Sequence, residues 1–379
     1  MPKVSVILTS YNHEKYIRAA IDSVLNQTFT NFELIIWDDA STDNSWSVIN
    51  SYSDLRVRKF RNEKREWGGL VNKVILTLEL GEYIAIHHSD DVWESNKLEK
   101  QVAILDEKPK IGAVFTNALA IDESGFALKD EKHFYFNIFK QPNRTRHEWL
   151  RFFLTQGNAL CHPSVLLRKE CYREFGLYRR YLPQVADFDM WIRVCLKFEI
   201  YVLPDKLTKF RVRDNDANAS GDRADTKVRR TYEFYKLLLN YRQLAKFDEL
   251  VKVFPEAEKF FRNDETDVDF ALAMSVLELN SFRFTKLFAQ DILFEIISDS
   301  ERSKNIKRLY GFDERDFITL TGKNDVFSIG EIVDRDAKIS EIYTSFSWRL
   351  TRPLRYFSRK IRLLCASFCL VKGSKAGRE

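Results

Sequence analysis

The sequence predicts an α/β protein with a doubly wound, mostly parallel sheet, followed by a region of helices alone. Up to about residue 225, continuous apolar runs alternate with stretches of helical periodicity, as in a parallel sheet covered on both faces. Beyond residue 226 only helical patterns remain. Acidic pairs directly follow two of the apolar runs, at the sheet edge where proteins of this class build their sites.

The apolar runs of the first 90 residues are typical of buried strands. They are expected at 4–9, 32–37, 57–60 and 82–88. The first helix repeats apolar residues from Ile17 to Leu25, with Asn12 as its expected N-cap. For the next helix, through Val48 and Ile49, Ser41, Thr42 or Asp43 could serve as the cap. A third helix, near 69–79, is expected to stop at Gly81.

The middle of the chain is less regular. Residues 122–147 are polar and aromatic without a clear period, so they are expected to form excursions over the sheet. The charged stretch 211–225 is expected either to be mobile or to close over a ligand, and it marks a domain boundary. The remaining patterns predict helices at 95–107, 146–154 and 188–198 and a strand at 111–118. The predicted parts are a sheet-containing domain at 1–225, a helical accessory region at 226–345 and a basic amphipathic tail at 346–379.

Composition and charge exclude several classes of protein. The apolar content of 45% and charged content of 30% are those of a globular protein, and no apolar run approaches the ~20 residues that cross a bilayer. From Arg349 onward the net charge is +8, whereas the rest of the chain carries −3, so no nucleic acid partner is expected. Five cysteines without a CxxC pair, and no signal peptide before the first strand, favour a cytoplasmic location.

Asp38 and Asp39 follow the second predicted strand. A carboxylate there can accept hydrogen bonds from a pyrimidine imide N–H or from ribose hydroxyls. The alternative is an N-cap for the following helix, a role that Ser41 or Asp43 could already fill. The sequence alone leaves both interpretations open.

Asp90 and Asp91 follow the fourth predicted strand. Two adjacent hard oxygen donors suit Mg²⁺ or Mn²⁺, whereas two like charges beside a buried strand are costly without a counter-ion. Helix capping before Trp93 would explain one aspartate better than two. The histidines at 87, 88 and 162 are expected to be packing residues, since no Cys/His cluster supports zinc.

Asp187 and Asp189 lie two positions apart at the start of a predicted helix, so they should face different sides. One could pair with Arg193, and the other could face a cleft as a general base. Taken alone, helix capping is the simpler explanation of both.

Together these motifs resemble the family 2 inverting glycosyltransferases, which have the GT-A nucleotide-sugar-binding fold. The resemblance covers about residues 3–215. The matching segments follow the family's order: VSVILTSYN (4–12), LNQTFTNFEL (25–34), WDDASTD (37–43), GEYIAIHHSDD (81–91) and the block from His162 to Val194.

The resemblance implies a hexosyl or related transferase that uses a nucleoside diphosphate sugar, with UDP or dTDP favoured over GDP. The acceptor would be a hydroxyl of a glycan or lipid-linked saccharide in surface polysaccharide biosynthesis. The resemblance implies that Thr9 and Tyr11 bind the nucleoside, and that Asp39 binds the base while Asp38 supports the turn. Asp91 and Asp90 would bind Mg²⁺ or Mn²⁺ as the family's DxD-like element. Asp187 would deprotonate the acceptor.

Two positions depart from the family pattern. Ala186 stands where the family often has Glu, and Arg213 ends the FRVR motif where the family usually has His, so Arg213 could contact the diphosphate instead. The QxxRW element and membrane helices of processive synthases are missing, which favours transfer of a single sugar. A non-catalytic sugar-nucleotide-binding or scaffold protein is the alternative. A nucleotidyltransferase is disfavoured, because LTSYNHEKY lacks the expected Gly-rich loop.

The tail, SWRLTRPLRYFSRKIRLLCASFCLV, combines basic and apolar residues. It resembles a segment of bacterial surface-polysaccharide glycosyltransferases. Such a segment suits an anionic membrane surface, at roughly 1 kcal/mol per well-placed cation. The sequence therefore predicts peripheral attachment to the inner face of the cytoplasmic membrane, with a solvated tail or a helix docked on a partner subunit as the alternatives.

Overall fold

A computed structural model describes residues 1–214, 218, 221, 223–279 and 281–351 of the chain. It divides into two compact units, Met1–Phe317 and Ile318–Glu379. The stretch at 211–225, expected to be mobile or to close over a ligand, lies partly outside the described residues. The predicted tail lies outside them from residue 352 onward. The three-part domain division stays a prediction.

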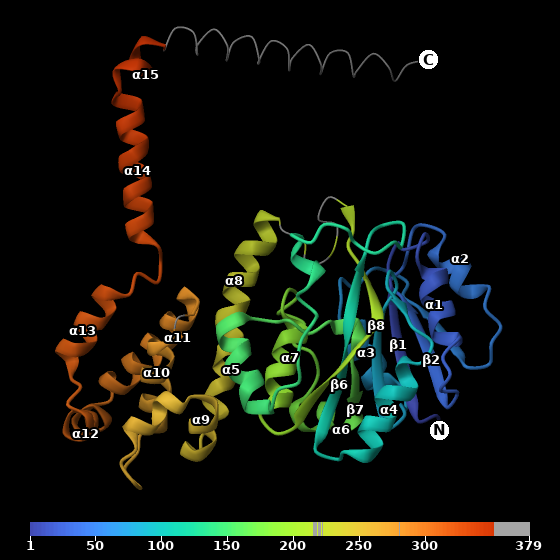
Figure 1. The fold of residues 1–379 in the computed structure, drawn as a ribbon, viewed down its shortest axis with the longest axis horizontal. Helices are drawn as coiled ribbons and strands as arrows, with labels where there is room; N and C mark the ends of the chain where they lie inside the picture. The colour runs from blue at the N-terminus through green and yellow to red at the C-terminus, as the bar shows by residue number, and fades with distance from the viewer. Residues whose placement is uncertain (215–217, 219–220, 222, 280, 352–379) are drawn as a thin grey trace. The chain divides into compact units, whose positions relative to one another are not determined.

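The first unit is built on one eight-stranded sheet, in the order β3-β2-β1-β4-β7-β6-β8-β5 (Figure 1). One direction is shared by β1, β2, β3, β4, β6 and β8. β7 runs antiparallel to its neighbours β4 and β6, and β5 runs antiparallel to β8. The predicted mostly parallel sheet is thus confirmed. The strands are β1 (Val4–Ser10), β2 (Phe32–Asp38), β3 (Val57–Arg61), β4 (Tyr83–His88), β5 (Val92–Trp93), β6 (Ile111–Ile121), β7 (Leu166–Arg168) and β8 (Glu199–Arg211).

Helices cover the sheet and explain its apolar strands. β2 is buried along its whole length and β1 nearly so, because side chains on both faces are covered. Ile17, Ile21 and Val24 of α1 are fully buried in the same core as Val6 and Leu8. The helices around the sheet are α1 (Ile17–Leu25), α2 (Ser45–Asn50), α3 (Leu70–Thr77), α4 (Lys97–Glu107), α5 (Arg146–Gln156), α6 (Lys169–Phe175) and α7 (Ala186–Cys195).

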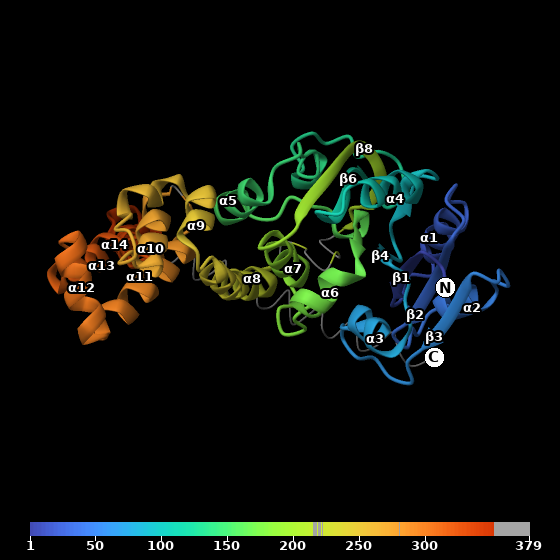
Figure 2. The ribbon, with the colours of Figure 1, turned by 90° about the horizontal axis from the view of Figure 1, so that it is seen from below.

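The C-terminal part of the first unit is helical, as predicted. Its helices from α9 to α12 gather beside α5 and α8, away from β1 to β3 (Figure 2). Its helices are α8 (Ala224–Leu238), α9 (Phe247–Val253), α10 (Val268–Glu278), α11 (Arg283–Ser298) and α12 (Ser300–Tyr310), with α13 (Glu314–Lys323) reaching the unit boundary.

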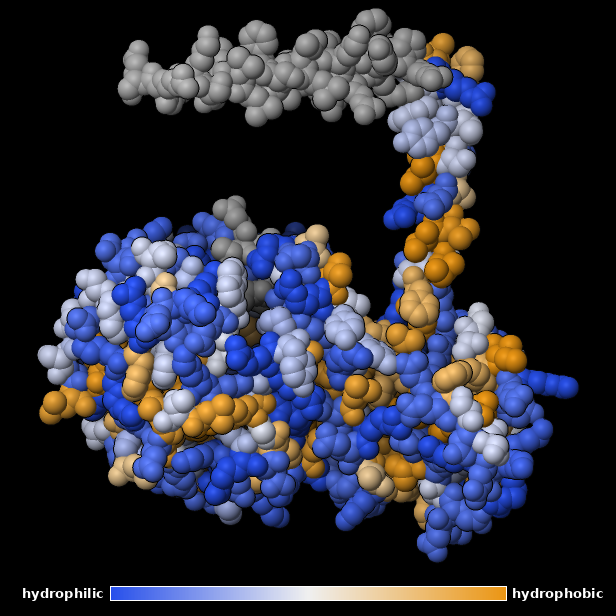
Figure 3. Space-filling view, turned by 180° about the vertical axis from the view of Figure 1, so that it is seen from behind, coloured by the Kyte–Doolittle hydropathy of each residue, from blue (hydrophilic) through white to orange (hydrophobic). Residues whose placement is uncertain are grey.

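The second unit contains α14 (Ile329–Thr344) and α15 (Phe346–Leu350). Apolar side chains are exposed along α14, among them Ile329, Val333 and Ile342, and hydrophobic colour lines this helix in Figure 3. In the described part of the chain, no helix combines the length and apolar character that crossing a bilayer requires.

Several local predictions were wrong. Asn12 does not cap a helix, because α1 begins at Ile17 after the capping position Tyr16. Asn12 instead has a φ of 52°, and its side-chain oxygen accepts the Thr42 N–H at 2.8 Å. The capping position of α2 is Asn44, one residue beyond the predicted caps. The strands β5, β7 and β8 were not predicted. β5 and β7 have only two or three residues, which are too few to show a period.

Asp189 fixes the start of α7. Its buried carboxylate accepts hydrogen bonds from Arg179 at 2.8 Å, Arg193 at 2.9 Å and Asn240 at 2.8 Å. The expectation that one aspartate of the pair binds Arg193 is confirmed. Because these bonds join α7 to two other segments, the helix is held in place from its first turn.

Candidate active site

The acidic pairs lie at one edge of the sheet, here called the rim, where β1, β2 and β4 end. Ser10 is opposite Asp38 in the sheet register, and Thr9 is opposite His88. The parallel strands therefore bring the residues after β2 and β4 to the same edge, at the top of the sheet in Figure 1.

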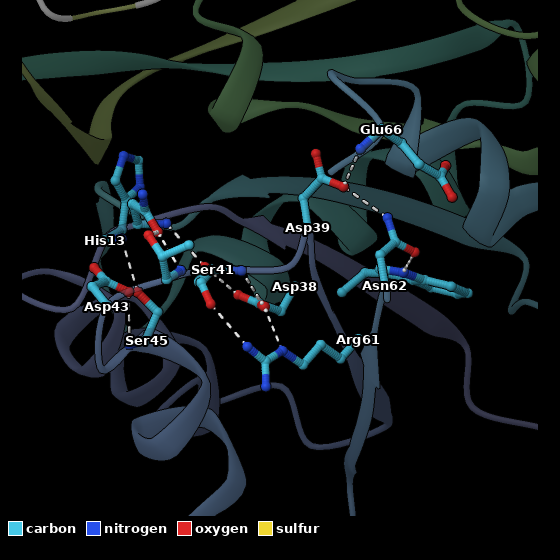
Figure 4. Close-up of polar contacts among 12 residues, drawn as sticks. His13, Asp38, Asp39, Ser41, Asp43, Ser45, Arg61, Asn62 and Glu66 are labelled. Carbon is cyan, nitrogen blue, oxygen red and sulfur yellow. Dashed lines mark hydrogen bonds and ion pairs between the residues drawn. The ribbon is translucent and has the colours of Figure 1, made fainter. Parts of the chain in front are cut away.

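Asp38 is completely buried and holds the turn that follows β2. One of its oxygens accepts from the Ser41 hydroxyl at 2.5 Å, and the other accepts from the Ser41 N–H at 2.9 Å and lies 3.4 Å from Arg61 Nε (Figure 4). The turn contains Ala40 with a φ of 58°, a conformation that non-glycine residues seldom adopt. The Asp38 contacts thus stabilise a strained backbone.

Asp39 connects the end of β2 to the 62–69 loop. Its Oδ1 accepts from Asn62 Nδ2 at 2.7 Å and from the Glu66 N–H at 2.9 Å (Figure 4). Among the described residues, Oδ2 accepts no protein hydrogen bond, so one oxygen of a largely buried carboxylate is available to an external donor. This arrangement suits recognition of an uncharged N–H or hydroxyl group.

The ring of Tyr11 is covered by the same loop. The Arg65 guanidinium lies 3.7 Å from the Tyr11 ring centre and 3.6 Å from that of Trp67, so it is stacked between the two rings. Trp67 has a φ of 58° and is 78% exposed. Thr9 lies next to this region in β1, where it is partly exposed. A ligand that stacks on this face of Tyr11 must displace Arg65.

His88, Asp90 and Asp91 form a group that could hold a metal ion. One ligand atom from each lies within 4.8 Å of the others. Asp91 is buried; its Oδ1 accepts the Arg211 N–H at 2.8 Å, whereas its Oδ2 has no hydrogen-bond partner. Burial, and secondarily the charge of Asp90, raises the pKa of Asp91 well above its usual range. A free buried oxygen beside two further ligand atoms fits a divalent cation.

The histidines differ in their surroundings. His87 is fully buried and packs 4.3 Å from the Trp93 ring, as a packing residue should. His88 lies in the candidate metal group, and its Nε2 is 3.3 Å from Nδ1 of His162. No local pattern indicates this pairing, because the two residues are 74 positions apart.

Arg213 also reaches the rim. Its Nη1 lies 3.0 Å from Nε2 of His13, and His13 Nδ1 lies 2.7 Å from the Ser89 hydroxyl. The Arg213 Nε is buried without a hydrogen-bond partner. A guanidinium with a free donor beside the Asp90 loop can bind an anionic oxygen.

Asp187 occupies the first turn of α7 and remains partly exposed. Its Oδ2 accepts from Asn158 Nδ2 at 3.1 Å. Burial raises the pKa of Asp187 to about 6, although hydrogen bonds from the Phe188 backbone and from Asn158 act in the opposite direction. Such a carboxylate is ionised at neutral pH and is more basic than an exposed one.

The 157–165 segment lies between the metal group and α7. The buried Cys161 has a pKa raised mainly by burial, and the charges of both Asp91 and Asp187 add to this effect. The segment also contacts both clusters directly, since Asn158 donates to Asp187 and His162 Nδ1 lies 3.3 Å from Nε2 of His88. It therefore connects two of the three acidic clusters, and the third lies along the rim at Asp39.

Comparisons with known proteins agree with this geometry. A family model described as Glycosyl transferase family 2 matches residues 5–168. "Putative glycosyltransferase EpsE" of Bacillus subtilis is 32% identical over 222 residues, which cover 57% of this chain and 75% of that protein. The chain belongs to glycosyltransferase family 2.

Other relatives of this family 2 glycosyltransferase are more distant. "Uncharacterized glycosyltransferase MJ1057" of Methanocaldococcus jannaschii is 26% identical over 251 residues, covering 65% of this chain and 82% of that protein. Residues 1–349 of S. aureus TarS, in a crystal structure with UDP-GlcNAc, align with a TM-score of 0.52 and 18% identity, over 84% of this chain and 90% of that one. The structural match supports the GT-A-type fold.

Sequence reasoning missed several contributors to the site of this glycosyltransferase. Arg211 holds Asp91 through its backbone and Asp90 through its side chain, and it stands in the same FRVR motif that identified Arg213. Asn62, Arg65 and Asn158 lie in loops without any periodic signal. Only the tertiary contacts of these loop residues identify them.

Replacement of Asp187 by Asn should raise the free energy of unfolding at neutral pH. The carboxyl pKa is about 6 when folded and near 4 when unfolded, so the wild-type free energy of unfolding falls as pH rises between these values. The free energy of unfolding of Asp187→Asn should not fall in this way. Its difference from wild type should therefore grow by roughly 1–3 kcal/mol between pH 4 and pH 7. Urea unfolding across this range measures the difference. The exposed Asp225→Asn controls for loss of a carboxylate, and a pH-independent Asp187→Asn difference would contradict the prediction.

Proposed function

We propose that the chain is an inverting, metal-assisted glycosyltransferase that moves one sugar from a nucleoside diphosphate sugar to a hydroxyl group. The acceptor would be a glycan or lipid-linked saccharide of a surface polysaccharide. The observation that carries this proposal is the partly exposed Asp187 carboxylate, whose pKa is raised to about 6. The 157–165 segment links it to the metal group, because Asn158 contacts Asp187 and His162 contacts His88.

The Asp187 carboxylate would act as the general base. It would take the proton from the acceptor hydroxyl while the acceptor oxygen forms a bond to the anomeric carbon. The bond from that carbon to the diphosphate oxygen would break on the opposite face, and the nucleoside diphosphate would leave with the electron pair. Proton transfer of this kind contributes about 10²–10⁴-fold to a rate.

The donor would lie along the rim. The free oxygen of Asp39 would accept a pyrimidine imide N–H, which is why UDP or dTDP is favoured, and Thr9 and Tyr11 would line the nucleoside pocket. Asp38 would maintain the turn that presents Asp39. Arg213 would bind the diphosphate through its unpaired Nε.

Asp90 and Asp91, with His88, would hold Mg²⁺ or Mn²⁺. When bound, such a cation would neutralise charge on the departing diphosphate. Arg211 prepares this group by fixing one oxygen of Asp91 and the Asp90 carbonyl, which leaves the Asp91 Oδ2 available.

Asp187→Asn should lower sugar transfer at least 10²-fold and leave nucleotide affinity within about threefold, because the amide keeps the shape but cannot accept the proton. The donor panel is UDP-, dTDP- and GDP-sugars, with nucleoside diphosphate release and calorimetric nucleotide binding as the measurements. Asp225→Asn is the control. Transfer that persists in Asp187→Asn rules out the base assignment, while nucleotide binding without turnover by the wild type favours the scaffold alternative.

Mn²⁺ should raise the melting temperature of the wild-type protein, and Asp91→Asn should abolish most of this shift, because a bound ion stabilises only the folded state. Glu94→Gln, which alters a nearby surface ion pair with Lys209, should retain the Mn²⁺-induced shift of the melting temperature. Differential scanning fluorimetry with and without EDTA measures the effect. An equal Mn²⁺ shift in wild type and Asp91→Asn would exclude Asp91 as a ligand.

The tail is proposed to attach the enzyme to the cytoplasmic membrane. Truncation after Ser345 should reduce co-sedimentation with vesicles containing anionic lipid by about tenfold or more, because it removes nine basic residues. Vesicles of neutral lipid provide the control. Unchanged partition of the truncated protein would refute this role.

A further inference from the structure

We propose that Asn158 is the positioning residue for Asp187, and that its side-chain amide determines which carboxylate oxygen faces the acceptor hydroxyl. This inference rests on the proposed function, in which Asp187 is the base. Asn158 donates to one oxygen of that carboxylate, Oδ2, whereas Oδ1 receives no side-chain hydrogen bond among the described residues.

The orientation of the Asn158 amide is fixed by a second hydrogen bond. Its Oδ1 accepts the Leu160 N–H at 3.0 Å, while its Nδ2 donates to Asp187 at 3.1 Å. If the Asn158 amide were reversed, its NH₂ group would face the Leu160 N–H and its oxygen would face the Asp187 carboxylate. The group that faces Asp187 is therefore always a donor.

The segment that carries Asn158 is rigid. α5 ends at Gln156 and is capped by Gly157, whose φ of 85° turns the chain and whose N–H donates to the Phe153 carbonyl. Beyond Asn158, Ala159 and Leu160 are almost completely buried. The next residues are tied to the core, since Trp93 donates to the Pro163 carbonyl at 2.8 Å and Gln101 to the Ser164 carbonyl at 2.8 Å. A side chain on such a segment can hold a partner to a defined geometry.

The charges around Asp187 explain why the partner is an amide. The charge of Asp187 adds to the raised pKa values of two buried groups, Tyr178 and Cys161, which burial above all keeps uncharged at neutral pH. The nearby Arg179 and Arg193 bind Asp189 instead. A cation on Asp187 would stabilise the carboxylate and weaken it as a base, whereas a neutral donor orients it at a smaller loss of basicity.

Asn158→Asp separates positioning from loop structure. The new carboxylate can still accept the Leu160 N–H, but it replaces the donor to Asp187 by a like charge. At pH 7, kcat should fall at least tenfold while KM for the donor changes less than threefold. The acid limb of the kcat profile should move to higher pH, so that activity recovers toward pH 9. The probe is release of the nucleoside diphosphate from the nucleotide sugar on which the wild type is fastest.

Two further variants complete the test. Asn158→Ala removes the donor without adding charge, so it should move the acid limb in the same direction by a smaller amount, and it serves if Asn158→Asp fails to fold. Gln156→Glu adds the same charge to an exposed side chain two residues away and should leave rate and pH profile unchanged.

The failures are distinguishable. A lowered rate with an unmoved acid limb in both Asn158 variants overturns the positioning role, while loss of transfer in Asp187→Asn keeps the proposed function intact. Full transfer by Asp187→Asn overturns the proposed function, and the role of Asn158 with it.

Discussion

The burial of carboxylates at the ends of parallel strands and in the first turn of α7 is the constraint on which this structure depends. A carboxylate removed from water requires hydrogen bonds, a counter-ion or a proton. Asp38 and Asp189 have the first two: Ser41 and Arg61 bind one, and Arg179 and Arg193 bind the other. Their contacts stabilise a turn and a helix, which gives these two carboxylates a structural role.

Asp91 and Asp187 are different, because each retains an oxygen that the protein does not satisfy fully. Asp91 Oδ2 is buried without a partner, and Asp187 has a neutral amide as its side-chain donor. Both pKa values are raised mainly by burial. Groups that the fold leaves poorly satisfied are costly to stability, so they are expected where a ligand or a reaction compensates for them. Asp39 differs from Asp38 in the same way, because one oxygen of Asp39 is free whereas both oxygens of Asp38 are bonded.

The elements around the rim hold these groups in a fixed relation. Arg211, at the end of β8, bonds to both Asp90 and Asp91. The 157–165 segment is anchored by Trp93 and Gln101 and brings Asn158 to α7. The acidic clusters are thus positioned by side chains from distant parts of the sequence, on elements that the core makes rigid.

The sequence by itself determined the strands β1 to β4 and β6 and the places of the acidic residues that follow them. Apolar runs such as 32–37 mark strands buried on both faces, and parallel strands bring the residues that follow them to one edge. It also identified the family and the helical C-terminal part. These features are local in the chain, so a short window of residues reveals them.

Only the tertiary structure decided which side chains complete the site. Asn12 was predicted to cap a helix but bonds across to Thr42, and His88 was predicted to pack but lies in the metal group beside His162. Asn158 and Arg65 carried no signal of their own, and the FRVR motif indicated Arg213 rather than Arg211. Their contacts join residues far apart in the chain, so the packing of the whole unit, rather than any local pattern, sets the hydrogen bonds, the burial and the pKa values of the site.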